Sequence, residues 1–276
     1  MKFLHPKTNW LFIKFIGQQL KKNDCLNRAG ALAFATLLTL VPLLAVILVV
    51  LAKFPFINSV GNDIQTFIFT NFVPTSGETI YAYVKKFIEQ ASHLSLIGSI
   101  SLVVTSILLL SNIEQTLNAI WQVTIRRNGL ISLLLHWTIL FLAPLLIALG
   151  FLISSYIFSL SFVMHATEWL HLKAYLLILT PFLLSAAAFS FLYIVMPNCK
   201  VKIHNAFIGG VVAAILFELA KQGFILYVRY FPSYELLYGA LAAIPLFLIW
   251  IYISWLVVLF GAEVSYALGA FRKRPL

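Results

Sequence analysis

The sequence predicts an all-α, polytopic membrane protein built as a bundle of six transmembrane helices. Of its 276 residues, 62% are hydrophobic and 10% are charged, whereas soluble domains carry about 25% charged residues. The apolar residues also gather in six runs with few or no charges, which is the pattern of helices that cross a hydrocarbon core of about 30 Å. A water-soluble globule is therefore excluded.

Residues 1–30 precede the first apolar run and form an amphipathic, cytoplasmic segment. Five apolar side chains share one broad helical face, and Lys14, Gln18, Lys21 and Lys22 occupy the other. Two interpretations stay open: a helix lying in the plane of an anionic leaflet, or a helix packed under the bundle by that apolar face. The apolar face consists of Trp10, Phe12, Ile13, Ile16 and Leu20.

The apolar runs predict where the chain crosses the bilayer. The loop at 53–93 contains two amphipathic stretches separated by Val73-Pro74 and Ser76-Gly77, so we expect an extracytoplasmic helical hairpin there. No linker or low-complexity tract divides residues 1–276, which predicts a single membrane domain. The expected spans are 32–52, 94–110, 132–156, 174–196, 206–226 and 241–268.

Basic residues set the expected orientation, because Lys and Arg near span ends are retained in the cytoplasm. Five of the 19 basic residues lie in the alternate connections, and Lys221 lies within a span. We therefore expect an inner-membrane protein with both termini cytoplasmic. The thirteen on the cytoplasmic side are Lys2, Lys7, Lys14, Lys21, Lys22, Arg28, Arg126, Arg127, Lys200, Lys202, Arg272, Lys273 and Arg274.

The composition favours no enzyme class. The net charge of +10 is spread over four segments, so positive-inside sorting explains it and no nucleic-acid partner is expected. No HExxH, GxSxG or Walker motif occurs, and Cys25 and Cys199 form no CxxC. We expect a non-enzymatic chain without cofactor, metal or catalytic residues.

Two charges in the fifth span are expensive for a membrane helix. Each of Glu218 and Lys221 costs at least about 2.5 to 3.5 kcal/mol at the bilayer centre. Their i,i+3 spacing lets them neutralise each other in part. They are candidates for a polar pathway, and the alternative is a structural ion pair that faces the bundle interior.

A second polar set lies near the cytoplasmic ends of three spans. Arg28 precedes the first span, Asn112, Glu114 and Asn118 follow the second, and Glu263 lies in the last turns of the sixth. We expect an inner-side network in which Arg28 pairs with Glu114 or Glu263. A latch that fixes helix packing is the favoured role, and a gate or binding site is the alternative.

The same residues carry a family resemblance. The run from Ala31 through Pro42, Glu114-x-x-x-Asn118-x-x-Trp121, Gly209-Gly210, Tyr238-Gly239, Trp250-x-Tyr252 and Gly261-Ala262-Glu263 resembles the YihY/BrkB family of bacterial inner-membrane proteins. The resemblance spans nearly the whole chain and implies a six-helix membrane protein. It assigns no catalytic role to Pro42, Trp121, Tyr238, Gly239, Trp250, Tyr252 or Gly261. The family's older label of ribonuclease BN is at odds with the missing metal-ligand motif.

We therefore expect transport, export or lipid handling across the cytoplasmic membrane. A non-enzymatic envelope scaffold or partner subunit is the first alternative, and a membrane-bound hydrolase is the second. The expected partners are the lipid bilayer and the anionic lipids of its cytoplasmic face. A homo-oligomer is compatible with the sequence.

Overall fold

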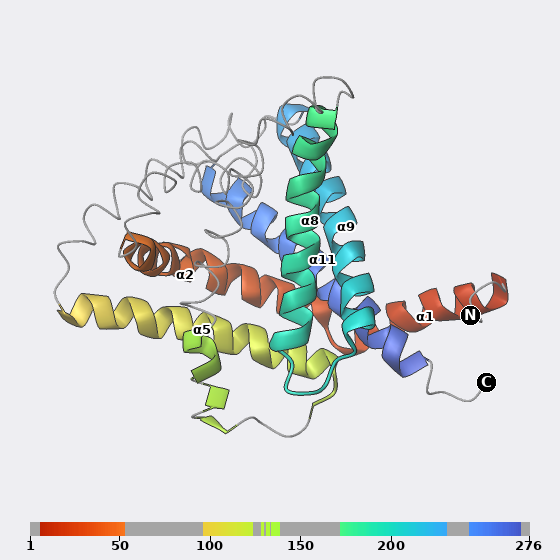
Figure 1. Cartoon of the computed structure of the whole chain (residues 1–276), viewed down its shortest axis with the longest axis horizontal. Coiled ribbons are helices and arrows are strands. Elements are labelled where there is room, and N and C mark those ends of the chain that lie inside the picture. The colour runs from red at the N-terminus through yellow and green to blue at the C-terminus, as the bar shows by residue number, and fades with distance from the viewer. Residues whose placement is uncertain are drawn as a thin grey trace.

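The described part of the chain is helical. The computed structural model describes residues 6–52, 96–123, 128–129, 131–132, 134–138, 172–230 and 243–271, and these contain no strand (Figure 1). The expected hairpin at 53–93, most of the third span, and Tyr238 and Gly239 lie outside those residues. The helices are α1 (Pro6–Lys22), α2 (Cys25–Ala52), α5 (Leu96–Ile120), α8 (Leu172–Val195), α9 (Ile203–Tyr230) and α11 (Ala243–Phe271).

Five of the expected spans coincide with helices of 24 to 29 residues. Within the part of the chain that the structure describes, two segments, Ile203–Tyr230 and Ile244–Phe271, are long and apolar enough to cross a membrane. The main difference is at α5, which continues ten residues past the expected end of its span. Ile113, Leu117 and Ile120 recur at helical spacing and are buried, so apolar packing extends the helix past its polar residues.

Helix α11 is central to the bundle. It contacts every other helix named above, while α8 packs on α9 and α2 packs on α5. Figure 1 shows the α8–α9 pair running across the direction of the α2–α5 pair. Leu259 and Ala262 of α11 and Ala213 of α9 are fully buried, so the core follows α11.

Glycines allow α9 to approach its two neighbours closely. A Cβ on Gly209 would lie 2.6 Å from the backbone oxygen of Gly261 in α11. A Cβ on Gly210 would overlap the hydroxyl of Ser190 in α8. Backbone approach of this kind is typical of helix packing in membranes, where small residues replace the hydrophobic driving force.

Two hydrogen bonds cross the apolar interior. The indole Nε1 of Trp255 in α11 donates to the hydroxyl of Thr36 in α2 at 2.9 Å, and that hydroxyl donates to the carbonyl of Leu32 at 2.7 Å. The phenol of Tyr193 in α8 donates to the carbonyl of Val258 in α11 at 2.7 Å. These bonds fix α2 and α8 relative to α11.

Helix α1 is packed against the bundle, as the second interpretation of residues 1–30 predicted. Phe15 and Ile16 are buried with Val264 and Ala267 of α11. The ring of Phe12 lies 5.6 Å from that of Phe271. Trp10 and Ile13, which were expected on the same face, are instead exposed, and the Lys14 ammonium lies 5.1 Å from the Trp10 ring centre.

Candidate functional site

The charged residues of α9 form an ion pair. Nζ of Lys221 lies 2.7 Å from one carboxylate oxygen of Glu218 and 2.9 Å from the other. The pair sits near the middle of the 28-residue helix. The side chain of Glu218 is 31% exposed and that of Lys221 is 12% exposed. The partial neutralisation expected from their spacing is confirmed, and a pathway role stays a prediction.

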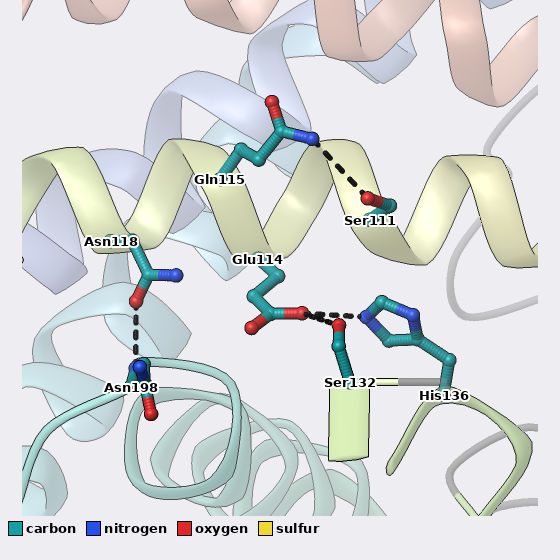
Figure 2. A network of polar contacts seen from close by, with 7 residues as sticks. All are labelled: Ser111, Glu114, Gln115, Asn118, Ser132, His136 and Asn198. Carbon is teal, nitrogen blue, oxygen red and sulfur yellow. Dashed lines mark hydrogen bonds and ion pairs between the residues drawn. The ribbon is translucent and has the colours of Figure 1, made fainter. Parts of the chain in front are cut away.

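A second polar group surrounds Glu114 of α5, as Figure 2 shows. Its Oε2 accepts a hydrogen bond of 2.7 Å from the Ser132 hydroxyl and lies 2.9 Å from Nε2 of His136. Glu114 and His136 are both buried. This contact joins α5 to the segment at 128–138, at the beginning of the expected third span.

Asn118 joins α5 to a different part of the chain. Its side-chain oxygen accepts a hydrogen bond of 2.6 Å from the backbone N–H of Asn198, in the connection between α8 and α9 (Figure 2). Just beyond it, the ring of Trp121 lies 6.3 Å from that of Tyr193 in α8. The end of α5 is therefore held against the end of α8.

The most deeply buried carboxyl of the described residues belongs to Glu263, whose exposed fraction is 0%. Its Oε1 accepts a hydrogen bond of 2.6 Å from the side-chain amide of Asn23, which lies in the turn between α1 and α2. The Cys25 thiol donates to the same oxygen at 3.6 Å. Its Oε2 is buried without a hydrogen-bond partner among the described residues.

The two cysteines differ sharply in environment. Burial, together with the adjacent Glu263 carboxyl, raises the pKa of the Cys25 thiol to about 12. Cys199 is exposed, and its partial desolvation raises its pKa above the ordinary value. Both thiols are free, as expected.

The expected inner-side network is divided into separate contacts. Nε of Arg28 donates to the backbone carbonyl of Asn23 at 2.9 Å rather than to a carboxylate. Arg28 and Glu263 thus share Asn23 as a neighbour, whereas Glu114 and Asn118 bond to residues on other segments. Asn112 is exposed. Among the described residues, the expected pairing of Arg28 with Glu114 or Glu263 does not occur: Ser132 and His136 contact Glu114, and Asn23 and Cys25 contact Glu263.

These contacts define what we call the inner end of the bundle. It comprises the α1–α2 turn, the end of α5, the α8–α9 connection and the last turns of α11. These are the segments that the basic residues assigned to the cytoplasmic side. Sequence reasoning placed Glu114, Asn118 and Glu263 here but missed their partners Asn23, Ser132, His136 and Asn198, which lie far away in the chain or carry no unusual local pattern.

Several motif residues have packing roles. The ring of Trp250 lies 5.4 Å from that of Phe217 and 5.3 Å from that of Phe224 in α9. A Cβ on Gly261 would lie 2.5 Å from the Tyr193 hydroxyl oxygen. Tyr252 lies beside Gly30 of α2, and α2 remains helical through Pro42. Among the residues that the structure describes, no three His, Cys, Asp or Glu side chains gather as metal ligands.

Comparison with known proteins agrees with the motif resemblance. Residues 16–275 match the family described as virulence factor BrkB. The chain is 43% identical to a UPF0761 membrane protein of Legionella pneumophila (strain Corby) over 264 residues, and 46% identical to one of Azotobacter vinelandii over 270. These alignments cover 95% and 97% of the chain but 63% and 65% of the relatives, so the chain spans just under two thirds of their length.

A UPF0761 membrane protein of Pseudoalteromonas atlantica is 40% identical over 271 residues, which cover 96% of the chain and 88% of that relative. No solved structure matches the chain. The family match extends over nearly the whole sequence and includes the polar residues of the inner end. The chain is therefore an integral membrane protein that belongs to the bacterial BrkB family.

Proposed function

We propose that this protein transports a substrate across the cytoplasmic membrane, with Glu218 and Lys221 lining the path. The observation that carries the proposal is an ion pair near the middle of a spanning helix, with the Glu218 side chain still 31% exposed. Charges at this depth are expensive in hydrocarbon and usually face a bundle interior or a water-filled cavity. A role in transport, export or lipid movement would explain why the chain keeps two charges despite their free-energy cost in the membrane.

The helical positions around the pair support a polar path. Glu218, Gln222 and Arg229 fall on one side of α9 when 100° is allowed per residue. Gln222 and Arg229 are exposed, as are the flanking apolar residues Leu219 and Leu226. One side of the outer half of α9 thus carries three polar side chains, interrupted by Ile225 and bordered by side chains suited to lipid.

A non-enzymatic scaffold is the second candidate. The contacts of the inner end favour it, because Asn23–Glu263, Asn118–Asn198 and Ser132–Glu114 each join separate segments and would hold a bundle rigid. The relatives' names, UPF0761 membrane protein, mention no enzymatic activity. We place this chain in the inner membrane with both termini cytoplasmic in either case.

The two candidates differ in whether water reaches Glu218. Glu218→Cys and Leu219→Cys are each made in a background with Cys25→Ser and Cys199→Ser, and reconstituted in vesicles. A charged, membrane-impermeant methanethiosulfonate reacts with thiolates only in water. If Glu218 lines a path, its cysteine reacts at least about tenfold faster than the one at Leu219, which is 64% exposed on the adjacent apolar side.

If neither cysteine reacts in correctly inserted protein, water does not reach the position of Glu218, and this result would favour the scaffold. Equal reaction at the two positions would also contradict a narrow path. Native Cys199, tested in the chain without engineered cysteines, shows that the reagent is active, because this thiol is exposed.

A further inference from the structure

The carboxyl of Glu263 has an unusual arrangement of hydrogen bonds. Both of its donors, the Asn23 amide and the Cys25 thiol, point to Oε1. The other oxygen, Oε2, is buried and has no partner among the described residues. By contrast, Glu218 receives Lys221 on both oxygens, at 2.7 and 2.9 Å. An ionised carboxylate accepts at two equivalent oxygens, whereas a protonated one has an accepting carbonyl and a donating hydroxyl.

A second buried atom points to the same conclusion. The side-chain oxygen of Gln19 is also buried without a hydrogen-bond partner, and an amide oxygen can only accept. Gln19 lies one helical turn before Asn23, to which its backbone is bonded at 2.8 Å. Because Phe12 meets Phe271 and Asn23 meets Glu263, α1 runs antiparallel to the last turns of α11. Gln19 lies between those two contacts.

Among the residues that the structure describes, no charged group forms an ion pair with Glu263. Lys22, at the end of α1, acts on it electrostatically without contact. In the adjoining turn and α2, Asp24 and Arg28 act on Cys25, and Arg28 is bonded to a backbone carbonyl. On α5, Glu114 accepts a hydrogen bond from Ser132 and lies 2.9 Å from Nε2 of His136. At neighbouring turns of α11, Gly261 and Gly269 approach uncharged groups of α8 and α9, namely the Tyr193 hydroxyl and the Asn205 amide.

We propose that Glu263 is a proton-binding site, neutral in this structure, with its proton on Oε2 and the side-chain oxygen of Gln19 as the acceptor. This assignment gives a role to two buried oxygens that otherwise have none. A bare carboxylate there would cost much more than a neutral acid. A metal ion would need more oxygen ligands than Glu263 and Gln19 provide.

The position of the site indicates which helix contact would change when the proton is released. Loss of the proton to the aqueous phase leaves a negative charge on Oε2 facing Gln19, an acceptor that repels it. Asn23 and Cys25 both donate to Oε1 and would bind an ionised carboxylate more strongly, so the contact that depends on the proton is the one between Gln19 of α1 and Oε2. If the proposed transport function holds, on which this last step rests, the proton is its coupling ion.

Infrared difference spectroscopy tests the site directly. The purified, lipid-reconstituted full chain should show at pH 7 a carboxylic-acid C=O band that shifts in D2O and weakens as the pH is raised. Glu263→Gln should remove this band, and the matched control Glu218→Gln should leave it unchanged. Identical acid bands in wild type and Glu263→Gln would overturn the proposal.

Thermal unfolding provides a second measurement. Glutamine copies the neutral acid, since its carbonyl can accept from Asn23 and Cys25 while its amide donates to Gln19. A neutral acid in the folded state stabilises at low pH, and this stabilisation is lost as rising pH ionises it. The unfolding temperature of wild type should therefore fall relative to Glu263→Gln as the pH rises; a constant advantage of wild type would contradict the site.

These measurements are independent of transport. An infrared acid band that depends on Glu263, together with a position 218 that water does not reach, would support the proton site and contradict the transport proposal. A water-accessible Glu218 without the acid band would do the reverse.

Discussion

At the scale of single residues, a polar contact could be predicted from the sequence only when its two partners are close together in the chain. Glu218 and Lys221 are three residues apart on one helix, so their ion pair follows from helical geometry alone. Glu263 is bonded to Asn23, 240 positions away in the chain. Its polarity marked it as important, but its partner depends on how α1 docks, which no local pattern specifies.

The two thiols give a prediction at this scale. Thiolates are the reactive form, and a shift of the Cys25 pKa from 9.0 to about 12 lowers its thiolate fraction by about 1,000-fold at any pH well below 9.0. Raising the pH from 7 to 9 should speed iodoacetamide modification of exposed Cys199, while buried Cys25 remains protonated and unmodified. Mass spectrometry of the alkylated peptides measures both rates.

Unfolding in detergent is the control, because it should make Cys25 react like an ordinary thiol. Rapid modification of Cys25 in the folded protein would mean that its contact with Glu263 opens readily.

At the scale of elements, close approach of helix backbones organises the fold. Gly209 and Gly210 face α11 and α8, and Gly261 faces Tyr193 and α9. The sequence displayed these glycines, and the family resemblance included them. The helix crossing itself could not be predicted, because the sequence around a helical glycine does not show whether the glycine faces lipid or the backbone of another helix.

A matched pair of glycine substitutions tests the crossing. Gly209→Ala should destabilise the protein by about 1 to 3 kcal/mol, because its Cβ would meet backbone that cannot move cheaply. Gly223→Ala, in the same helix, meets nothing within 4 Å and should be neutral or stabilising by up to about 1 kcal/mol through helix propensity. Thermal unfolding in one detergent compares them.

Equal stability of the two variants would show that α9 and α11 are farther apart than described. Greater destabilisation by Gly223→Ala would indicate that an additional partner covers that position.

At the scale of the whole molecule, the long-range polar contacts join the segments expected in the cytoplasm. The helical class and five helices agree with what composition and periodicity predicted. Helix α1 takes the packed position, one of the two that the amphipathic pattern left open. The polar residues of the inner end were identified from their position beside spans. Their pairing was not, because it requires the order in which the helices pack.

The predicted sidedness is testable with the native thiol. Cys199, exposed in the α8–α9 connection, and an engineered Lys273→Cys should react with an impermeant maleimide only after cells are permeabilised, because basic segments stay cytoplasmic. Ser76→Cys, in the expected outer loop, should react in intact cells. Cys25 is unsuitable as a reporter because it is buried on either side.

Labelling of Cys199 in intact cells as fast as Ser76→Cys would reverse the orientation. Protection of all three positions in intact cells would place the 53–93 loop in the cytoplasm or within the protein.

Because Trp255 and Thr36 share a hydrogen bond, we expect these two positions to vary together among related sequences. Thr36 uses its hydroxyl twice, as a donor to Leu32 and as an acceptor for the indole. Serine can replace it, but valine of the same shape would leave a partly buried N–H without its acceptor, at a cost of about 1 kcal/mol. A lineage can abandon the hydroxyl only after phenylalanine or another apolar residue has replaced the tryptophan, so the order of mutation is constrained.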